Sequence, residues 1–207
     1  MTDSVYDLLN PVGKTSQQRF WDTFTGSQLK SWWTFKNFAG SGTGAIDDSL
    51  DGGYKITTAG NTNDSSGIFT NDIRQFDPAA HVYTQVVKMS ATTSIIQIGG
   101  LTNDDTLPWN NRISFFVNTG TNSSFNLITT NGGTSSVVAS SISLDTSWHK
   151  ARTEGRASSA ILHLDDTLES VSTSNLPTVK CQQYLRVQTL TTATRSTSIR
   201  YMEVYNT

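Results

Sequence analysis

The sequence predicts an all-β protein, a sandwich of two antiparallel sheets with a short N-terminal arm, and three observations predict it. Apolar residues recur mostly with a period of two over short stretches, as in strands that bury one face. Clusters of Gly, Asn, Asp, Ser and Thr separate these stretches and indicate tight turns. Ser and Thr make up roughly a quarter of the chain and charged residues only 15%, which suits strands with a neutral, hydroxyl-rich surface.

The chain divides into an arm and one domain. Residues 1–18 are expected to form the arm, because only Ser4–Leu9 has a helical pattern and Pro11 would end that helix. So short a helix would have to pack on its own domain or on a partner. Residues 19–207 are expected to form a single domain, since all-β domains commonly reach this size undivided.

The strands follow from the two-residue period. The clearest is Arg112–Asn118, where every second residue from Ile113 to Val117 is apolar. Phe116 breaks the alternation and is expected to cover a second surface. The other expected strands are Gly53–Thr58, His81–Ser90, Ser94–Leu101, Ser124–Thr130, Ser135–Leu144, His149–Glu154, Ala160–Leu164, Tyr184–Thr189 and Ser198–Tyr205. This number of strands suits two stacked sheets.

Composition and charge exclude several classes of partner. The formal net charge is −2 and no basic run occurs, so nothing in the sequence predicts nucleic-acid binding. The opening residues resemble neither a secretory signal nor a membrane anchor, which favours another route if the protein acts outside a cell, such as a virion or a specialised secretion system. The lone Cys181 can form no internal disulfide and is expected to be a buried, inert thiol.

One stretch of sequence resembles a laminin G pattern. The residues TSWHKARTEGRASSAILHLDD place a Trp–His pair at the start of a strand and an Asp-centred turn after the next strand. The matching residues are Trp148, His149, Leu162, Leu164 and Asp165. The sequence departs from the pattern at Ala151 and Thr153, which are usually larger aliphatics, and at Asp166, which is commonly Gly.

The two ends of the domain extend the likeness. The opening WDTFTGSQLKSWW has an Asp-x-Phe sequence followed by Trp, at Asp22, Phe24 and Trp32, and the closing SIRYMEVYN is similar to the final strand of such domains. Over residues 20–207 the chain therefore resembles the concanavalin A-like lectin/glucanase superfamily. The resemblance implies a jelly-roll sandwich whose first and last strands pair, with Met202 and Val204 facing the core.

The opening segment is also unusually rich in aromatic residues. Phe20, Trp21, Trp33, Phe35 and Phe38 all lie within it. Such density is typical of a core or a subunit interface. The alternative is a platform for a sugar.

No catalytic site is predicted. A glycoside hydrolase needs two carboxylates roughly 5–9.5 Å apart, and the family 16 members of the superfamily carry them in a Glu-x-Asp-x-x-Glu pattern on one strand. That pattern is absent, and the histidines have no catalytic or metal-binding spacing, so structural hydrogen bonding is expected of them. The glutamates are Glu154, Glu169 and Glu203, and the histidines are His81, His149 and His163.

The loop TNDDTLPWNN at residues 102–111 is the candidate carbohydrate-binding site. The ring of Trp109 could stack on a pyranose, while Asp104, Asp105 and Asn110 could exchange hydrogen bonds with its hydroxyls. The alternative is that Trp109 packs into the rim of the sandwich and the polar residues serve a long turn.

Paired acids in turns are the other candidate site. The pairs are Asp47 with Asp48, Asp104 with Asp105, and Asp165 with Asp166. The resemblance implies that such loop carboxylates could hold Ca²⁺, as in lectins and pentraxins of this fold. Solvated turn residues are the alternative, and no cofactor or metal site is predicted.

The sequence is compatible with three functions. The preferred one is a non-enzymatic virion structural protein, either a capsid decoration protein or a tail-associated subunit, because no targeting signal is visible and the arm offers an attachment device. It implies a homo-oligomer on the virion surface that contacts capsid or tail proteins and binds glycans. The alternatives are a secreted, extracellular carbohydrate-binding module or lectin, and a degenerate glycoside hydrolase.

Overall fold

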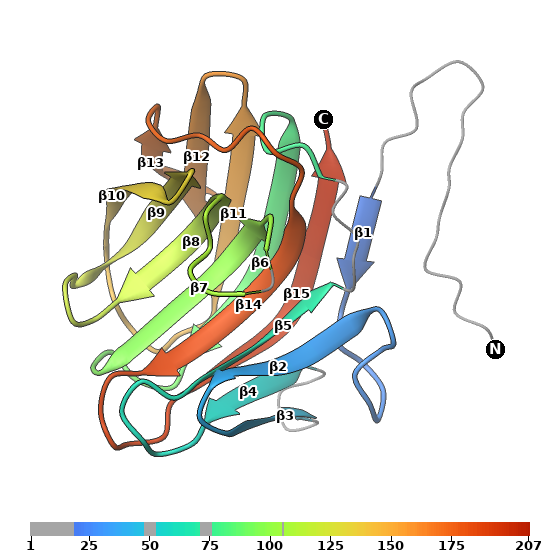
Figure 1. Cartoon of the computed structure of the whole chain (residues 1–207), viewed down its shortest axis with the longest axis vertical. Helices are drawn as coiled ribbons and strands as arrows, with labels where there is room; N and C mark the ends of the chain where they lie inside the picture. The colour runs from blue at the N-terminus through green and yellow to red at the C-terminus, as the bar shows by residue number, and fades with distance from the viewer. Residues whose placement is uncertain (1–18, 48–52, 71–75, 105) are drawn as a thin grey trace.

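The fold is all-β and consists of two antiparallel sheets that face each other (Figure 1). A computed structural model describes residues 19–47, 53–70, 76–104 and 106–207. The predicted arm at residues 1–18, with its helix at Ser4–Leu9, lies outside the described residues. The described ranges contain no helix, and therefore no helical segment that could span a membrane. The predicted fold class is confirmed.

One sheet has eight strands, in the order β13-β12-β11-β6-β15-β4-β3, with β1 paired to β15. Because β15 lies between β6 and β4, the last strand of the chain completes the middle of this sheet. The strands are β1 Arg19–Asp22, β3 Gly42–Ile46, β4 Tyr54–Thr58, β6 His81–Met89, β11 His149–Arg156, β12 Ser159–Leu164, β13 Thr167–Ser172 and β15 Ser196–Asn206.

The other sheet has seven strands, in the order β10-β9-β8-β7-β14-β5-β2. Every pair in it is antiparallel, and β14 lies between β7 and β5. The strands are β2 Trp33–Ala39, β5 Ser65–Thr70, β7 Ile95–Thr102, β8 Arg112–Asn118, β9 Ser124–Asn131, β10 Thr134–Ser143 and β14 Gln182–Thr189.

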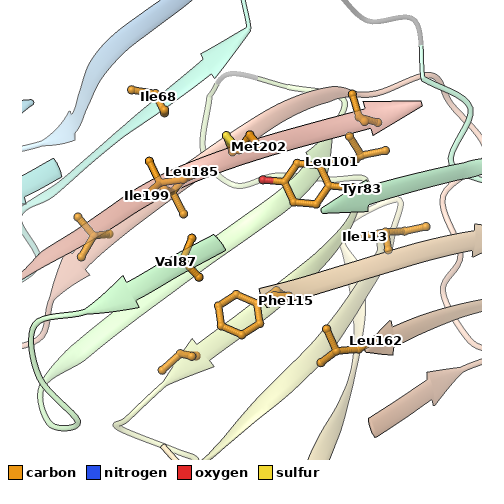
Figure 2. Packing of buried hydrophobic residues seen from close by; sticks show 14 of the residues in the cluster. Ile68, Tyr83, Val87, Leu101, Ile113, Phe115, Leu162, Leu185, Ile199 and Met202 are labelled. Carbon is orange, nitrogen blue, oxygen red and sulfur yellow. The ribbon is translucent and has the colours of Figure 1, made fainter. Parts of the chain in front are cut away.

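The hydrophobic core lies between the two sheets (Figure 2). Ile68 and Leu185 of the seven-stranded sheet and Ile199 and Met202 of the eight-stranded sheet are fully buried there. Each such side chain stabilises the fold by about 1.5–3 kcal/mol. Cys181 is also buried, as expected, and burial raises the pKa of its thiol to about 12.

The opening and closing strands pair as the family resemblance implied. β1 lies beside β15 (Figure 1), with Phe20 opposite Val204 and Asp22 opposite Met202. Met202 and Val204 are fully buried in the core, and so is Phe20 at 7% exposure. The aromatic residues of the opening segment therefore divide, since Phe20 packs in the core while Trp21 is 40% exposed.

Asp22 organises this corner of the sandwich. Its carboxylate is 1% exposed and accepts hydrogen bonds from the backbone N–H of Phe24 at 2.7 Å and from Nε1 of Trp33 at 2.8 Å. Nε1 of Trp32 donates to it at 3.2 Å, and Nζ of Lys30 lies 3.2 Å away. The Asp-x-Phe and Trp positions of the superfamily pattern are thus the parts of one buried hydrogen-bonded cluster.

His149 and Asp165 hold the start of β11 to the turn after β12. Nδ1 of His149 lies 2.7 Å from Asp165 Oδ2, and Nε2 lies 2.9 Å from Asp145 Oδ1. Asp165 Oδ1 also accepts the backbone N–H of Lys150 at 2.9 Å. Burial opposes protonation, but the hydrogen bonds and charges of the two aspartates outweigh it and raise the pKa of His149. The matching positions of the laminin G pattern thus have a structural role.

The substitution His149→Gln is expected to destabilise the protein by about 2 kcal/mol at about pH 5.5, because it removes hydrogen bonds between charged groups. Since the folded-state pKa of His149 is raised, its contribution is fully present below the unfolded-state pKa and is lost as pH rises through the folded-state value. Urea unfolding of both proteins at about pH 5.5 and about pH 8.5 measures this, and the difference should shrink at the higher pH.

His163 provides the opposite control. Burial and the charge of Arg152 lower the pKa of His163, so His163→Gln should become relatively more stable as the pH falls. If the loss of unfolding free energy caused by His149→Gln grew with pH, it would contradict the raised pKa and the positive charge assigned to His149.

Candidate functional site

The outer face of the seven-stranded sheet is the candidate functional site. Along β14, Leu185 and Val187 enter the core between the sheets, while Tyr184 and Arg186 lie on the outer face. All four residues are at most 8% exposed. A strand that is buried on both sides must be covered by a second layer of side chains.

A second apolar cluster supplies that layer. It is separate from the core, and it combines residues of six strands with one residue of the loop after β7. Its buried members are Phe69, Ile98, Trp109, Phe116, Ile128 and Tyr184, and the partly buried Phe38 and Ile96 pack against them. The expectation that Phe116 covers a second surface is confirmed.

Two glycines make room for this cluster. Gly67 of β5 lies opposite Arg186, and a Cβ there would stand 2.5 Å from the Leu185 carbonyl oxygen and 3.0 Å from the ring of Phe38. Gly100 of β7 lies opposite Tyr184, where a Cβ would stand 2.3 Å from the Ile113 carbonyl oxygen. Glycine inside a strand marks such close approaches.

Trp109 lies at the centre of the cluster. Its ring centroid is 4.2 Å from that of Tyr184, and it meets the ring of Phe38 edge-on at 5.8 Å. The residue is 3% exposed, and its Nε1 has no hydrogen-bond partner among the described residues. Tyr184 in turn shares a 2.5 Å hydrogen bond with Ser114, and burial raises its pKa to about 12. The buried indole N–H of Trp109 is therefore an unsatisfied hydrogen-bond donor among the described residues.

Cations surround these rings. The guanidinium of Arg186 lies 5.6 Å from the Trp109 centroid and 5.8 Å from that of Phe38. The Arg112 guanidinium is 5.9 Å from Trp109, and Lys36 Nζ is 5.6 Å from Phe38. Burial, and then the charge of Arg112, lower the pKa of Arg186 to about 10, which leaves it cationic at neutral pH. Cation–π contacts thus join the three cations to the aromatic cluster.

Acidic residues are absent from the strands of this sheet. None of its seven strands, all of which are described, contains Asp or Glu. All three glutamates lie on the eight-stranded sheet, where Glu154 pairs with Arg152 and Arg156 and Glu203 pairs with Arg19. Glu169 is on β13 and accepts hydrogen bonds from Ser141 at 2.7 and 3.0 Å. The strands thus offer no carboxylate pair for glycoside hydrolysis on the outer face.

The predicted loop residues have different surroundings. Trp109 is turned onto the sheet, and Asp104 Oδ1 accepts the backbone N–H and hydroxyl of Thr106 at 3.1 and 2.8 Å. Asn110 is exposed, and its carbonyl accepts the N–H of Gly133 at 2.9 Å. Asp105 lies outside the described residues. The structure therefore brings Trp109 to the outer face with Tyr184 and Arg186. Asp104 stabilises its own loop, and Asn110 joins this loop to the turn between β9 and β10.

Other candidate groups have structural partners. Nδ1 of His81 lies 3.1 Å from the Pro78 carbonyl oxygen, and burial lowers its pKa to about 4. Asp165 contacts His149, and Asp166 Oδ1 lies 2.7 Å from Lys150 Nζ. Asp48 lies outside the described residues. Within the described ranges, no three His, Cys, Asp or Glu side chains gather as metal ligands would.

Sequence reasoning named Phe38, Trp109 and Phe116 separately, but it missed Phe69, Tyr184 and Arg186 and the cluster that all of them form. Phe38, Phe69, Tyr184 and Arg186 lie on three strands that are adjacent in space but far apart in the chain. The available signal was a strand with bulky side chains at both odd and even positions, as in QYLRV of β14. Such a run indicates burial on both faces of a sheet.

Known structures with the same architecture include enzymes and binding domains. Neither a protein family nor a curated protein sequence matches the chain. A Bacillus licheniformis β-glucanase superimposes with a TM-score of 0.66 at 11% identity, over 91% of this chain and 98% of that one. A β-1,3-glucanase from Mycobacterium marinum gives 0.66 at 12%, over 89% and 97%. The Emp47p carbohydrate recognition domain gives 0.63 at 10%, over 89% and 93%. The chain therefore has the concanavalin A-like jelly-roll fold that glucanases and this recognition domain share.

Proposed function

We propose that this chain is a non-catalytic carbohydrate-binding domain that holds a polysaccharide against the outer face of the seven-stranded sheet. The observation that carries the proposal is the aromatic cluster on that face, in which the buried Trp109 and Tyr184 lie beneath the partly exposed ring of Phe38. Aromatic rings stack on the apolar faces of pyranoses. The shared fold with glucanases and a carbohydrate recognition domain supports it.

Polar atoms within the same face can recognise hydroxyl groups. Nε1 of Trp109, a donor, and Oε1 of Gln182, an acceptor, are buried without partners among the described residues. Buried polar atoms normally have hydrogen-bond partners, so these two are suited to a ligand. Since the seven strands contain no carboxylate, the face supplies recognition without the acid and nucleophile of a hydrolase.

The substitution Phe38→Ala is expected to weaken polysaccharide binding about tenfold, because it removes the partly buried ring that packs edge-on to Trp109. Affinity electrophoresis against a panel of soluble polysaccharides measures the binding, and a reducing-sugar assay on the same mixtures measures turnover. The control is Trp21→Ala, since Trp21 lies on β1 of the other sheet. Binding that Phe38→Ala leaves unchanged, or release of reducing ends by the wild-type protein, would overturn the proposal.

The biological setting remains a separate proposal. We propose, from the sequence-based reasoning alone, that the domain serves as a homo-oligomeric capsid decoration or tail-associated subunit at a virion surface. A secreted extracellular lectin would use the same outer face. Mass spectrometry of purified virions distinguishes the two settings, since a virion subunit is expected at a stoichiometry that matches the particle symmetry.

A further inference from the structure

Positive charge is concentrated on the outer face of the seven-stranded sheet. Its strands contain three basic residues, Lys36, Arg112 and Arg186, and no acidic residue, so they carry a formal charge of +3 − 0 = +3. The whole chain has a net charge of −2. On the other sheet, by contrast, Arg19 and Arg156 each pair with a glutamate.

Arg186 is the most deeply buried of these cations. The residue is 8% exposed, and its Nε is buried without a hydrogen-bond partner among the described residues. Its Nη2 donates to Oε1 of the neutral Gln188. The Nε of Arg112 donates to Thr130 Oγ1 at 3.0 Å. Within the described ranges neither arginine forms a salt bridge, although a buried charge normally has a partner of opposite sign.

We infer that the ligand of this face is an anionic polysaccharide whose carboxylate or sulfate group binds Arg186, with Arg112 and Lys36 adding positive charge around it. This rests on the proposed carbohydrate-binding function. The planar guanidinium matches both anions with paired N–H donors. The partly exposed ring of Phe38, next to the guanidinium and packed on the buried Trp109, provides the apolar surface for the sugar that carries the charge.

Matched pairs of polysaccharides test the charge of the ligand. Polygalacturonate and its carboxyl-reduced form differ only in the carboxylate, and dextran sulfate and dextran differ only in the sulfate. We expect the full chain to bind the charged member of at least one pair tenfold or more tightly than its neutral partner, and the two pairs distinguish carboxylate from sulfate.

Substitutions test the role of Arg186. Arg186→Gln is expected to lower the affinity for the charged member at least tenfold. The control Arg156→Gln makes the same change of charge on β11 of the other sheet and is expected to leave the affinity unchanged. Lys36→Gln, at a partly buried position, is expected to weaken binding in the same direction. Arg186→Met should leave the thermal unfolding midpoint unchanged or higher, because it removes a buried cation that has no anionic partner.

Each other outcome overturns the inference. Equal affinity for charged and neutral members, with Phe38→Ala still weakening both, contradicts the anionic ligand and leaves the proposed function standing. Equal losses in Arg186→Gln and Arg156→Gln indicate nonspecific attraction. A lower unfolding midpoint in Arg186→Met, with binding retained, assigns Arg186 a structural role. If the wild-type protein binds none of the soluble polysaccharides that are used to test Phe38→Ala, the proposed function itself is contradicted.

Discussion

Replacing Asp22 with Ala is expected to destabilise the fold by about 4 kcal/mol, since removal of one partner from a buried ionic cluster leaves the others without compensation. The carboxylate accepts from the backbone N–H of Phe24 and from the indoles of Trp32 and Trp33, and it lies 3.2 Å from Lys30 Nζ. Lys30 could reach water after the change, but the Trp33 side chain, 4% exposed, could not. One substitution therefore leaves buried donors unpaired at the point where β1 leads into β2.

Two further variants separate the sources of this loss. Asp22→Asn keeps the shape and one acceptor oxygen, so we expect a smaller loss of about 2 kcal/mol. Asp166→Asn removes an exposed charge that pairs with Lys150, at a residue with φ +67° that Asn also tolerates, and should leave the stability nearly unchanged. Urea unfolding followed by far-UV circular dichroism measures all three. A loss below about 1 kcal/mol for Asp22→Ala would contradict the role assigned to the cluster.

Replacing Trp109 with Ala is expected to cost about 3 kcal/mol of stability and to abolish polysaccharide binding. The side chain is 3% exposed and packs against Tyr184 and Phe38, so truncation removes the centre of the outer-face cluster. The stability effect follows from lost packing alone. The binding effect tests the proposed function, because the ligand would lose the ring that supports Phe38 and the Nε1 donor.

Conservative variants keep these two effects apart. Trp109→Phe retains a ring and removes an N–H that has no partner among the described residues, so we expect a loss of about 1 kcal/mol in stability. If Nε1 serves the ligand, binding by Trp109→Phe falls although the protein remains folded. Trp21→Ala should change stability by about 0.5 kcal/mol or less, because Trp21 is 40% exposed. Polysaccharide binding that survives in a folded Trp109→Ala protein would remove Trp109 from the site.

The alternation of apolar residues predicted the two-sheet fold and most of its strands, and three of the strands that it missed lack alternation. β5 reads SSGIFT and is buried at every position, so no polar side marks it as a strand. β3 reads GTGAI, and its glycines weaken any strand signal. β13 reads TLESVS and lies at the edge of its sheet, where both faces tolerate polar residues.

The motif positions were recognised from sequence, but their roles required the structure. Asp22 and Trp32 match a superfamily pattern, yet only the fold shows that one carboxylate joins two indoles. His149 and Asp165 are 16 residues apart in the chain and meet because the β11–β12 hairpin brings them together. Local sequence patterns identify such residues but do not show which residues they contact.

The candidate site was less predictable than the fold. The sequence left Trp109 open between a sugar platform and a residue packed into the rim of the sandwich, and its surroundings come from strands that are distant in sequence. The run QYLRV indicated that Arg186 is buried, but its place in a sheet without acidic residues depends on six other strands. Such a property belongs to the assembled sheet and to no segment of the sequence.

The central position of β15 affects the synthesis of the protein as well as its shape. During translation, β6 and β4 leave the ribosome long before Ser196–Asn206 is available to join them. Until then the nascent polypeptide cannot close the eight-stranded sheet, and strands from both sheets expose apolar surface. Folding of the domain is therefore expected to finish after synthesis of β15, and a stop codon before this strand would release an aggregation-prone product.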